Sequence, residues 1–418
     1  MNWNRISFYL IVSLVLLLID FYAWQSIKLL SSNNNQTVRR IIGAIYWSIT
    51  VGTFITFFAS QLTDFSKWPQ NFKTYLIAAI VILYLSKLVM VLFLFMDDIF
   101  RFFRWIWEKL FDHTAQDSNT SIGRIKFFSQ LGSILGGTLL VIFLYGMIRN
   151  AYNYQLLKVK ITLPNLPDAF NGLRIVQISD IHTGSFTTKH PIHKAVEMVN
   201  AQNADYIFFT GDLVNEQSDE ALPYIDIFKK VKSKHGVFSI LGNHDYGDYR
   251  NWNTPQDKID NMTLLESIHE QLGWQLLRNK NVMIGEKGNQ IAVIGIDNWS
   301  SSLRFPKYGK MAEACIGTEE AKVKLLLSHD PSHWDSEVTT EYKNVDVTFS
   351  GHTHGMQFGI EIPGFIKWSP VSLVYPHWAG LYNQENQYLY VNRGLGFLGY
   401  PGRVGILPEI TLIELVKG

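Results

Sequence analysis

The sequence contains few cysteines and few charged residues for its length. Cys315 is the only thiol in the 418-residue chain, so neither an intrachain disulfide nor a cysteine-based zinc site can form. Charged residues make up 17% of the chain, below the roughly 25% that is usual in soluble domains. Because disordered chains are charge-rich and poor in aromatics, a chain with 14% aromatic residues is expected to fold.

The sequence also lacks an excess of positive charge. The 37 Lys and Arg residues balance 36 Asp and Glu residues, which gives a formal net charge of +1. Binding to nucleic acid requires neutralisation of phosphates and therefore a basic excess. We therefore expect no nucleic-acid partner.

Four long hydrophobic runs lie before residue 150, and none contains proline. Each run is close to the roughly 20 residues that a helix needs to cross a bilayer. No small-x-small cleavage site follows the first run, so we interpret it as a retained span rather than a signal peptide. We predict an all-α bundle of four transmembrane helices in a domain at residues 1–150, with spans at 6–24, 41–62, 75–96 and 131–148.

The charges between these spans predict an orientation in the membrane. Loops 24–40 and 97–130 carry eight Lys and Arg residues, whereas the other side, which includes Lys67, carries six. Because cytoplasmic loops are enriched in Lys and Arg, we predict a multi-pass integral membrane protein with both termini on the extracytoplasmic side. Residues 99–111 mix basic with aromatic side chains, which favours an interfacial amphipathic helix. An extension of the third span is the alternative.

Two charged residues lie inside the predicted spans. Asp20 is 14 residues into the first span and Lys87 is 12 residues into the third. At 1.5 Å per residue, they lie about 21 and about 18 Å along helices that run in the same direction. We predict that they can pair at one depth, since a charge inside a membrane usually has a partner. The alternative is that each faces the bundle interior or snorkels.

From residue 155 the sequence changes to short apolar runs that end in polar residues, with helical stretches at 190–203, 219–233 and 255–272. Alternating strands and helices predict an α/β (α+β) domain of about 260 residues. Five strand ends carry side chains that bind metals: Asp180 with His182, Asp212, Asn243 with His244 and Asp245, His329, and His352 with His354.

These strand ends suit a pair of divalent metal ions. Ligands gather where the strands of an α/β sheet end, and residues one position apart on an extended segment project to the same side. Oxygen and imidazole donors without thiolates favour Mn, Fe or Zn. The donors are too many for one tetrahedral ion, whereas two ions bridged by a carboxylate would use them all. The glycines that precede Asp212, Asn243 and His352 would allow close backbone approach.

The motif order D-x-H, GD, GNHD, H and GHxH resembles the calcineurin-like metallophosphoesterase superfamily over residues 158–418. The segments SDIHTGSF, TGDLVN, GNHDY, LLSHDP, SGHTHGMQ and RGLGFLGYPGRVG are most similar to its membrane-associated bacterial branch. Gly355-Met356 stands where that branch more often has two glycines. The resemblance implies a sandwich of two mixed sheets flanked by helices, with the site at the strand ends.

The resemblance also implies a role for each motif residue. The ligands of one metal ion would be Asp180, His182 and His354. The ligands of the second ion would be Asn243, His329 and His352, and the residue that bridges both ions would be Asp212. The catalytic pair would be His244, which points at the leaving-group oxygen, and Asp245, which orients His244.

This arrangement predicts a metal-dependent phosphoric ester hydrolase. Two cations lower the pKa of a shared water, which gives a hydroxide that attacks phosphorus, with His244 as the acid for the leaving group. The predicted substrate is a phosphate mono- or diester. The alternative is a non-catalytic membrane receptor or scaffold that retains the fold.

For four further features of the sequence, two interpretations remain open. The aromatic stretch 365–382 is either a wall that admits a lipid-linked phosphate or a hairpin packed on the second sheet. The insertion 246–262 is either a substrate-covering loop or a plain surface loop. Arg393 and Arg403 would clamp a phosphate oxygen or, preferably, stabilise their loops. Asp330 either fixes a motif histidine or is a turn residue before Pro331.

Overall fold

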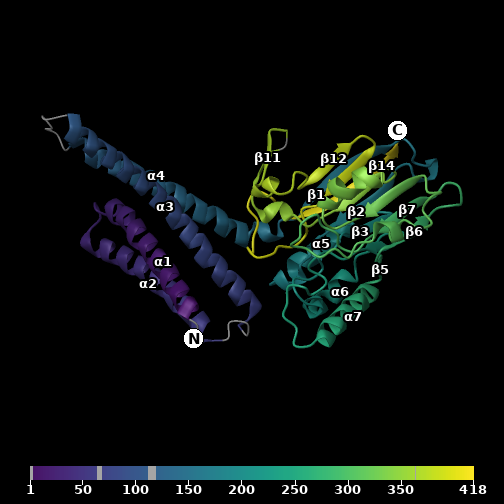
Figure 1. Ribbon diagram of the computed structural model, residues 1–418, viewed down its shortest axis with the longest axis horizontal. Coiled ribbons are helices and arrows are strands. Elements are labelled where there is room, and N and C mark those ends of the chain that lie inside the picture. Colours follow the sequence, from purple (N-terminus) through teal and green to yellow (C-terminus); the bar gives the residue numbers. More distant parts are fainter. Residues whose placement is uncertain (1–2, 64–67, 112–118, 363) are drawn as a thin grey trace. The chain divides into compact units, whose positions relative to one another are not determined.

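The computed structural model describes residues 3–63, 68–111, 119–362 and 364–418 (Figure 1). Lys67, one of the loop charges behind the predicted orientation, lies outside these residues. The chain divides into two compact units, Met1–Tyr145 and Gly146–Gly418. The first unit is helical and the second combines sheets with helices.

Four long helices form the first unit. They are α1 (Trp3–Leu30), α2 (Gln36–Leu62), α3 (Gln70–Phe111) and α4 (Asn119–Ile148). Among the described residues, four segments are long and apolar enough to cross a membrane: Ser7–Leu30, Gln36–Leu62, Gln70–Phe111 and Lys126–Tyr152. The prediction of four spans is therefore confirmed.

Helix α3 is longer than the sequence analysis expected. It continues without a break through residues 99–111, so this stretch extends the third span and is not a separate interfacial helix. Its 42 residues make a rod of about 63 Å. The hydrocarbon core of a bilayer is about 30 Å thick.

The predicted intramembrane pair is present. Lys87 on α3 forms an ion pair with Asp20 on α1, and both side chains are buried. Two tyrosines complete the surroundings of Asp20: Tyr46 on α2 donates to its backbone carbonyl at 2.7 Å, and Tyr84 on α3 donates to its carboxylate at 2.7 Å. This polar cluster joins α1, α2 and α3 inside the predicted spans, where the hydrocarbon of a bilayer offers no hydrogen-bond partners.

Small residues join α4 to its neighbours. Ser26 Oγ on α1 lies 2.5 Å from Ser129 Oγ and 2.9 Å from Ser133 Oγ. A Cβ atom at Gly136 would lie 2.6 Å from the carbonyl oxygen of Ser86, so α3 and α4 are in backbone contact at that position. Hydroxyl bonds and close backbone approach are the usual basis of helix packing in lipid.

The second unit contains two six-stranded sheets. The first has the order β1 (Gln155–Leu163), β14 (Glu409–Lys417), β2 (Leu173–Ile178), β3 (Tyr206–Phe209), β4 (Val237–Ser239) and β5 (Trp274–Leu276). The second has the order β12 (Gly380–Gln384), β13 (Gln387–Val391), β9 (Val347–Ser350), β8 (Val323–Leu327), β7 (Ile291–Gly295) and β6 (Lys280–Ile284). Each sheet mixes parallel and antiparallel pairs.

The sheets face each other across one core and are covered by helices outside. The core between them includes Ile175 and Phe208 from the first sheet and Val293, Leu325 and Phe349 from the second. The outer helices are α5 (His190–Asn200), α6 (Ile225–Phe228) and α7 (Pro255–Leu272) on the first sheet, and α8 (Met311–Ala314) with the segment Trp334–Val338 on the second. The predicted sandwich of two mixed sheets flanked by helices is confirmed.

One hairpin lies outside both large sheets. Strands β10 (Ile360–Ile362) and β11 (Ile366–Trp368) form a separate two-stranded sheet, followed by the short helical segment Pro370–Leu373. The hairpin projects from the second unit near the label β11 (Figure 1). For the aromatic stretch 365–382, the predicted hairpin on the second sheet is therefore found only at the residues that belong to β12.

Replacing only one residue of the Asp20–Lys87 pair is expected to destabilise the helical unit more than replacing both residues. Asp20→Asn or Lys87→Met alone leaves one buried charged group without its partner, which costs about 3–5 kcal/mol. The double variant leaves no unpaired charge and should recover most of this loss. Thermal unfolding of the full chain in detergent, for wild type, both single variants and the double variant, measures this, and additive losses would contradict the pairing.

Candidate metal centre

Five strand ends meet at one edge of the sandwich. Strands β2, β3 and β4 are parallel neighbours in the first sheet, and β8 and β9 are parallel neighbours in the second. Two hydrogen bonds join the sheets at this edge: Gln177 Nε2 donates to the Ser350 carbonyl at 2.9 Å, and His329 Nδ1 donates to the Thr210 carbonyl at 2.7 Å. The polar residues that follow these strands therefore converge.

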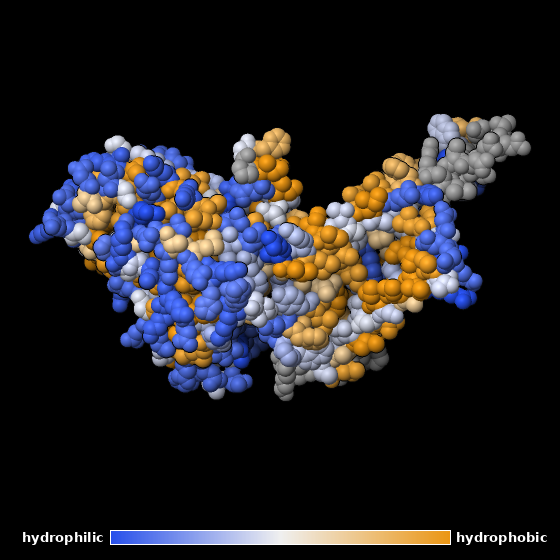
Figure 2. Space-filling view, turned by 180° about the vertical axis from the view of Figure 1, so that it is seen from behind, coloured by the Kyte–Doolittle hydropathy of each residue, from blue (hydrophilic) through white to orange (hydrophobic). Residues whose placement is uncertain are grey.

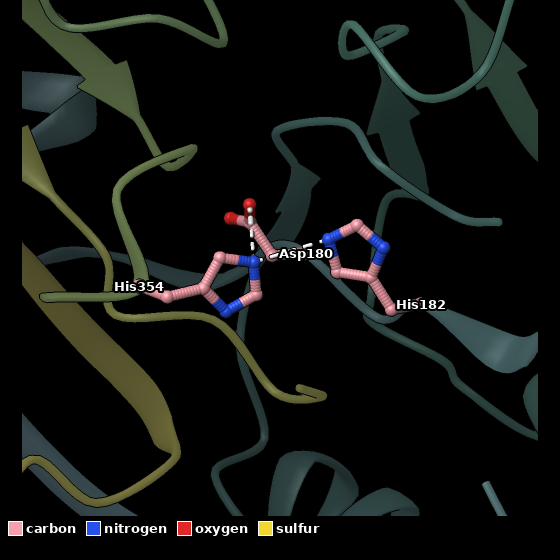
Figure 3. A group of neighbouring side chains, drawn as sticks. All are labelled: Asp180, His182 and His354. Atoms are coloured by element: carbon pink, nitrogen blue, oxygen red, sulfur yellow. Dashed lines mark hydrogen bonds and ion pairs between the residues drawn. The ribbon is translucent and has the colours of Figure 1, made fainter. Parts of the chain in front are cut away.

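Asp180, His182 and His354 form the first cluster of potential ligands (Figure 3). The Nε2 atoms of His182 and His354 lie 3.0 Å apart, and His354 Nε2 lies 3.3 Å from Asp180 Oδ1. All three side chains are buried, and their ligand atoms lie within 4.8 Å of one another. Residues from the end of β2 and the end of β9 thus share one small volume.

Asp212, His329 and His352 form a second such cluster. Asp212 Oδ2 lies 3.0 Å from His329 Nε2 and 3.6 Å from His182 Nε2, so one carboxylate oxygen faces both clusters. Asn243 adjoins the second cluster, with its Oδ1 2.7 Å from His352 Nδ1. The structure therefore brings together all seven side chains that the sequence analysis named as metal ligands.

The donor atoms fit divalent metal ions. His329 Nε2 is buried and makes no hydrogen bond, although Asp212 Oδ2 lies 3.0 Å away. Burial lowers the pKa of His182 to about 3, so this imidazole is in the neutral form that binds metals. Clustered buried imidazoles and carboxylates are the donor set of ions such as Mn, Fe and Zn.

The backbone of these residues is strained. Five candidate ligands have φ values from 49° to 73°, in the left-handed region: Asp180, His182, Asp212, His352 and His354. Residues other than glycine seldom adopt this region, at a cost of order 1–3 kcal/mol each. The paired residues at the ends of β2 and β9 thus converge through left-handed turns, and not through the alternation of an extended strand that the sequence analysis assumed.

Two glycines permit the close packing that the sequence analysis expected. A Cβ atom at Gly242 would lie 2.2 Å from Asp212 Oδ1, and one at Gly351 would lie 2.2 Å from Asp180 Oδ2. Any other residue would displace a carboxylate of the centre. The expectation for the glycines before Asn243 and His352 is confirmed.

Outer residues hold the imidazole rings in place. His182 Nδ1 lies 3.1 Å from Asn215 Oδ1. His352 Nε2 lies 2.9 Å from the Tyr375 hydroxyl and 3.5 Å from Asp330 Oδ2. Such partners fix the tautomer and the direction of a metal-binding imidazole. Asp330 thus supports His352 and not the adjacent His329.

Asn215 and Tyr375 belong to the centre but were not predicted from the sequence. Asn215 lies in the TGDLVN segment, three residues after Asp212. Its position close to a motif residue could have indicated that it lies near the centre. Tyr375 lies in the aromatic stretch 365–382, where nothing in the sequence distinguishes it from its neighbours.

The two C-terminal arginines stabilise loops, as the preferred interpretation expected. Arg393 forms ion pairs with Glu409 and Glu361. Arg403 is fully buried and donates to the carbonyls of Arg393 and Gly394 at 2.9 and 3.1 Å. Its guanidinium also lies 3.3 Å from His354 Nδ1, which connects the C-terminal motif to the first cluster.

His244 lies beside both clusters and is half-buried. Its backbone N–H donates to Asp212 Oδ1 at 2.8 Å, and its Nδ1 donates to the Asn215 carbonyl at 2.7 Å. Its ring centroid lies 5.0 Å from the His182 ring and 4.7 Å from the Tyr249 ring. With Nδ1 engaged by a carbonyl, Nε2 is the nitrogen available for chemistry.

Asp245 contacts the backbone and does not orient His244. Its carboxylate accepts hydrogen bonds from the N–H groups of Asp212, Leu213 and Gly242 at 2.8, 2.8 and 2.9 Å. The acceptor at His244 Nδ1 is the Asn215 carbonyl, and not the Asp245 carboxylate that the resemblance implied. Asp245 instead ties the loop after β3 to the loop after β4.

Comparison with known proteins agrees with this architecture. The family model described as "Probable Calcineurin-like phosphoesterase, transmembrane domain" matches residues 4–151, and "Calcineurin-like phosphoesterase" matches residues 173–356. A zebrafish (Danio rerio) transmembrane protein with metallophosphoesterase domain is 27% identical, over 98% of this chain and 89% of its own.

Two bacterial relatives match more than half of the chain. The Bacillus subtilis uncharacterized metallophosphoesterase YkuE is 29% identical, over 60% of this chain and 81% of its own. The Chlamydia muridarum UDP-2,3-diacylglucosamine pyrophosphatase LpxG is 29% identical, over 55% of this chain and 81% of its own.

Replacing Asp245 is expected to destabilise the second unit. Asp245→Ala leaves several buried N–H groups without an acceptor, at about 2–4 kcal/mol in total, and Asp245→Asn turns an NH2 group toward N–H donors. Both variants should unfold at lower temperature than wild type in a thermal scan of the full chain. Asp226→Asn, an exposed position on α6, is the control. Unfolding of Asp245→Ala at the wild-type temperature would contradict the structural role.

Proposed function

Because the chain belongs to the calcineurin-like metallophosphoesterases, we propose that its centre hydrolyses a phosphate mono- or diester with two divalent metal ions. The protein is a metal-dependent phosphoric ester hydrolase with a four-helix membrane domain. The single observation that carries the detailed proposal is the Asp212 carboxylate, whose Oδ2 faces both ligand clusters.

The proposed ligands follow the two clusters. One ion would be held by Asp180, His182 and His354, and the other by Asn243, His329 and His352. Asp212 would be shared between them, since it is the carboxylate that approaches a histidine of each cluster. The donors suit Mn, Fe or Zn.

The bound ions would polarise the ester and supply a hydroxide nucleophile near neutral pH. The chain itself supplies the acid. His244 is directed by the Asn215 carbonyl at Nδ1, so its Nε2 gives a proton to the leaving oxygen as the phosphorus–oxygen bond breaks. A positioned proton donor of this kind typically accelerates the reaction by a factor of about 10²–10⁴.

Tyr249 supports the interpretation of part of the insertion 246–262 as a substrate-covering loop. Its hydroxyl accepts a hydrogen bond from Asn243 Nδ2 at 2.8 Å, and its ring lies against the His244 ring. The side chain is 42% exposed, so it borders both the centre and the solvent. A substrate that reaches His244 would contact it.

We further propose a lipid-linked phosphate ester as the substrate. The spanning helices keep the enzyme in a membrane, and one relative is named for a diacylated sugar nucleotide. In this proposal the catalytic unit lies on the extracytoplasmic side, which the excess of Lys and Arg in the opposite loops favours. A non-catalytic receptor is the alternative, and the complete set of ligand residues favours the enzyme.

Metal binding tests the ligand assignment without reference to activity. The purified wild-type protein is expected to retain two Mn²⁺ ions per chain, and Asp180→Ala is expected to retain one. Asp212→Ala is expected to retain fewer Mn²⁺ ions than wild type and to lose hydrolysis of bis(p-nitrophenyl) phosphate. Elemental analysis after gel filtration gives the stoichiometry. Asp226→Ala is the matched control, and wild-type metal content in Asp212→Ala would reject the shared carboxylate.

The acid role of His244 predicts a dependence on the leaving group. His244→Ala should slow hydrolysis of an alkyl phosphate ester by about 10²–10⁴, and that of a p-nitrophenyl ester far less, because p-nitrophenolate leaves without a proton. His190→Ala, at an exposed histidine, should change neither rate. Equal losses for both leaving groups would assign His244 to substrate positioning instead.

A further inference from the structure

A group of large apolar side chains is exposed on the catalytic unit, on and beside the β10–β11 hairpin. Phe365 is 86% exposed, Leu373 85% and Val374 74%. The projection formed by the hairpin carries hydrophobic side chains at its tip (Figure 2). Single exposed apolar residues are ordinary on soluble proteins, but a contiguous group marks a binding surface.

The hairpin has one apolar face and one polar face. Its register pairs Ile360 with Trp368 and Ile362 with Ile366. Cross-strand partners share a face and successive residues alternate, so these four side chains lie on one side. All four are exposed. We call them, together with Phe365 and Leu373, the apolar hairpin surface.

The polar face is the one that holds the hairpin to the rest of the unit. Glu361 and Lys367 pair with each other in the register and lie opposite the apolar face. Glu361 Oε1 forms an ion pair with Arg393 Nη2 at 2.5 Å. Lys367 donates to the Ala379 carbonyl and lies 5.1 Å from the centroid of the Trp378 ring.

This arrangement is the reverse of a water-soluble hairpin, which buries its apolar face and exposes its polar one. The polar contacts fix the hairpin so that its apolar side chains point away from the protein. Further backbone contacts support the base: Ser369 Oγ donates to the Gly355 carbonyl at 2.8 Å, and the Gly359 N–H donates to the Val404 carbonyl at 2.9 Å. The exposure is therefore built into the packing.

The apolar hairpin surface lies between residues of the metal centre along the chain. The segment starts shortly after His354, a member of the first cluster. It ends just before Tyr375, whose hydroxyl lies 2.9 Å from His352 Nε2. Residues of the metal centre thus flank both ends of the segment that carries this surface.

We propose that the apolar hairpin surface inserts into the lipid bilayer and docks the catalytic unit on the membrane, with the metal centre at the level of lipid phosphates. The bilayer is the occupant because the chain guarantees its presence: the last span ends at Tyr152, and β1 begins at Gln155. Burial of Phe and Leu side chains in the interface is favourable. The delivery of lipid substrates rests on the proposed function, whereas the docking does not.

Lipid contact at the hairpin is measured directly in the full chain. Cys315 is the only cysteine, so Cys315→Ala permits a single label at Phe365→Cys or, as control, at Ile316→Cys, which is 72% exposed elsewhere on the unit. The labelled protein is reconstituted in phosphatidylcholine–phosphatidylglycerol vesicles with and without brominated lipid. We expect an environment-sensitive fluorophore to be quenched by brominated lipid at Phe365→Cys and not at Ile316→Cys.

Each other outcome overturns the docking. Equal, weak quenching at the two positions means that the hairpin stays in water. A blue-shifted emission at Phe365→Cys without lipid quenching means that a protein, such as a second copy of the chain, covers the surface instead.

Lipid delivery is tested with two esters that share one leaving group. One is a p-nitrophenyl phosphodiester of diacylglycerol in vesicles, and the other is soluble bis(p-nitrophenyl) phosphate. We expect the double variant Phe365→Asp/Leu373→Asp to lower the ratio of lipid to soluble hydrolysis by about tenfold or more, and Ile316→Asp to leave the ratio unchanged. An unchanged ratio in the double variant overturns lipid delivery. If the wild type hydrolyses neither ester, the proposed function fails, while the quenching result still decides the docking.

Discussion

The centre depends on Asp212, which contacts the loops of both sheets at once. Its carboxylate accepts from the His244 N–H on the loop after β4 and approaches His329 after β8. Its backbone carbonyl accepts from the His182 N–H after β2 at 3.1 Å, and its own N–H donates to Asp245. One residue with a left-handed backbone therefore fixes the distances among four loops.

This concentration of contacts explains why the centre carries strain. Several carboxylates and imidazoles cannot approach so closely unless the strand ends turn sharply and the residues beside them are glycine. The hydrophobic core between the sheets holds the strands in register, and the loops absorb the strain. A rigid sandwich with strained loops positions metal ligands more accurately than flexible loops could.

Much of the second unit was predictable because its signals are local. Five buried strands are short apolar runs, and each of these runs is followed by motif residues, such as Asp180 after β2 or His352 after β9. Roles that depend on remote contacts were not predictable. Nothing local indicates that the Asn215 carbonyl, and not Asp245, holds His244, or that Arg403 reaches His354. In the helical unit, the rise per residue predicted the Asp20–Lys87 pair, but a mixture of basic and aromatic residues did not reveal that α3 continues.

The position of β14 has a consequence for the order in which the protein matures. This strand comes after every other strand in the sequence, yet it lies between β1 and β2 in the first sheet. The sheet therefore cannot close until residues 409–417 have left the ribosome, by which time the four hydrophobic helices have long been synthesised. The helical segments are thus available for insertion into the membrane before the first sheet of the second unit is complete.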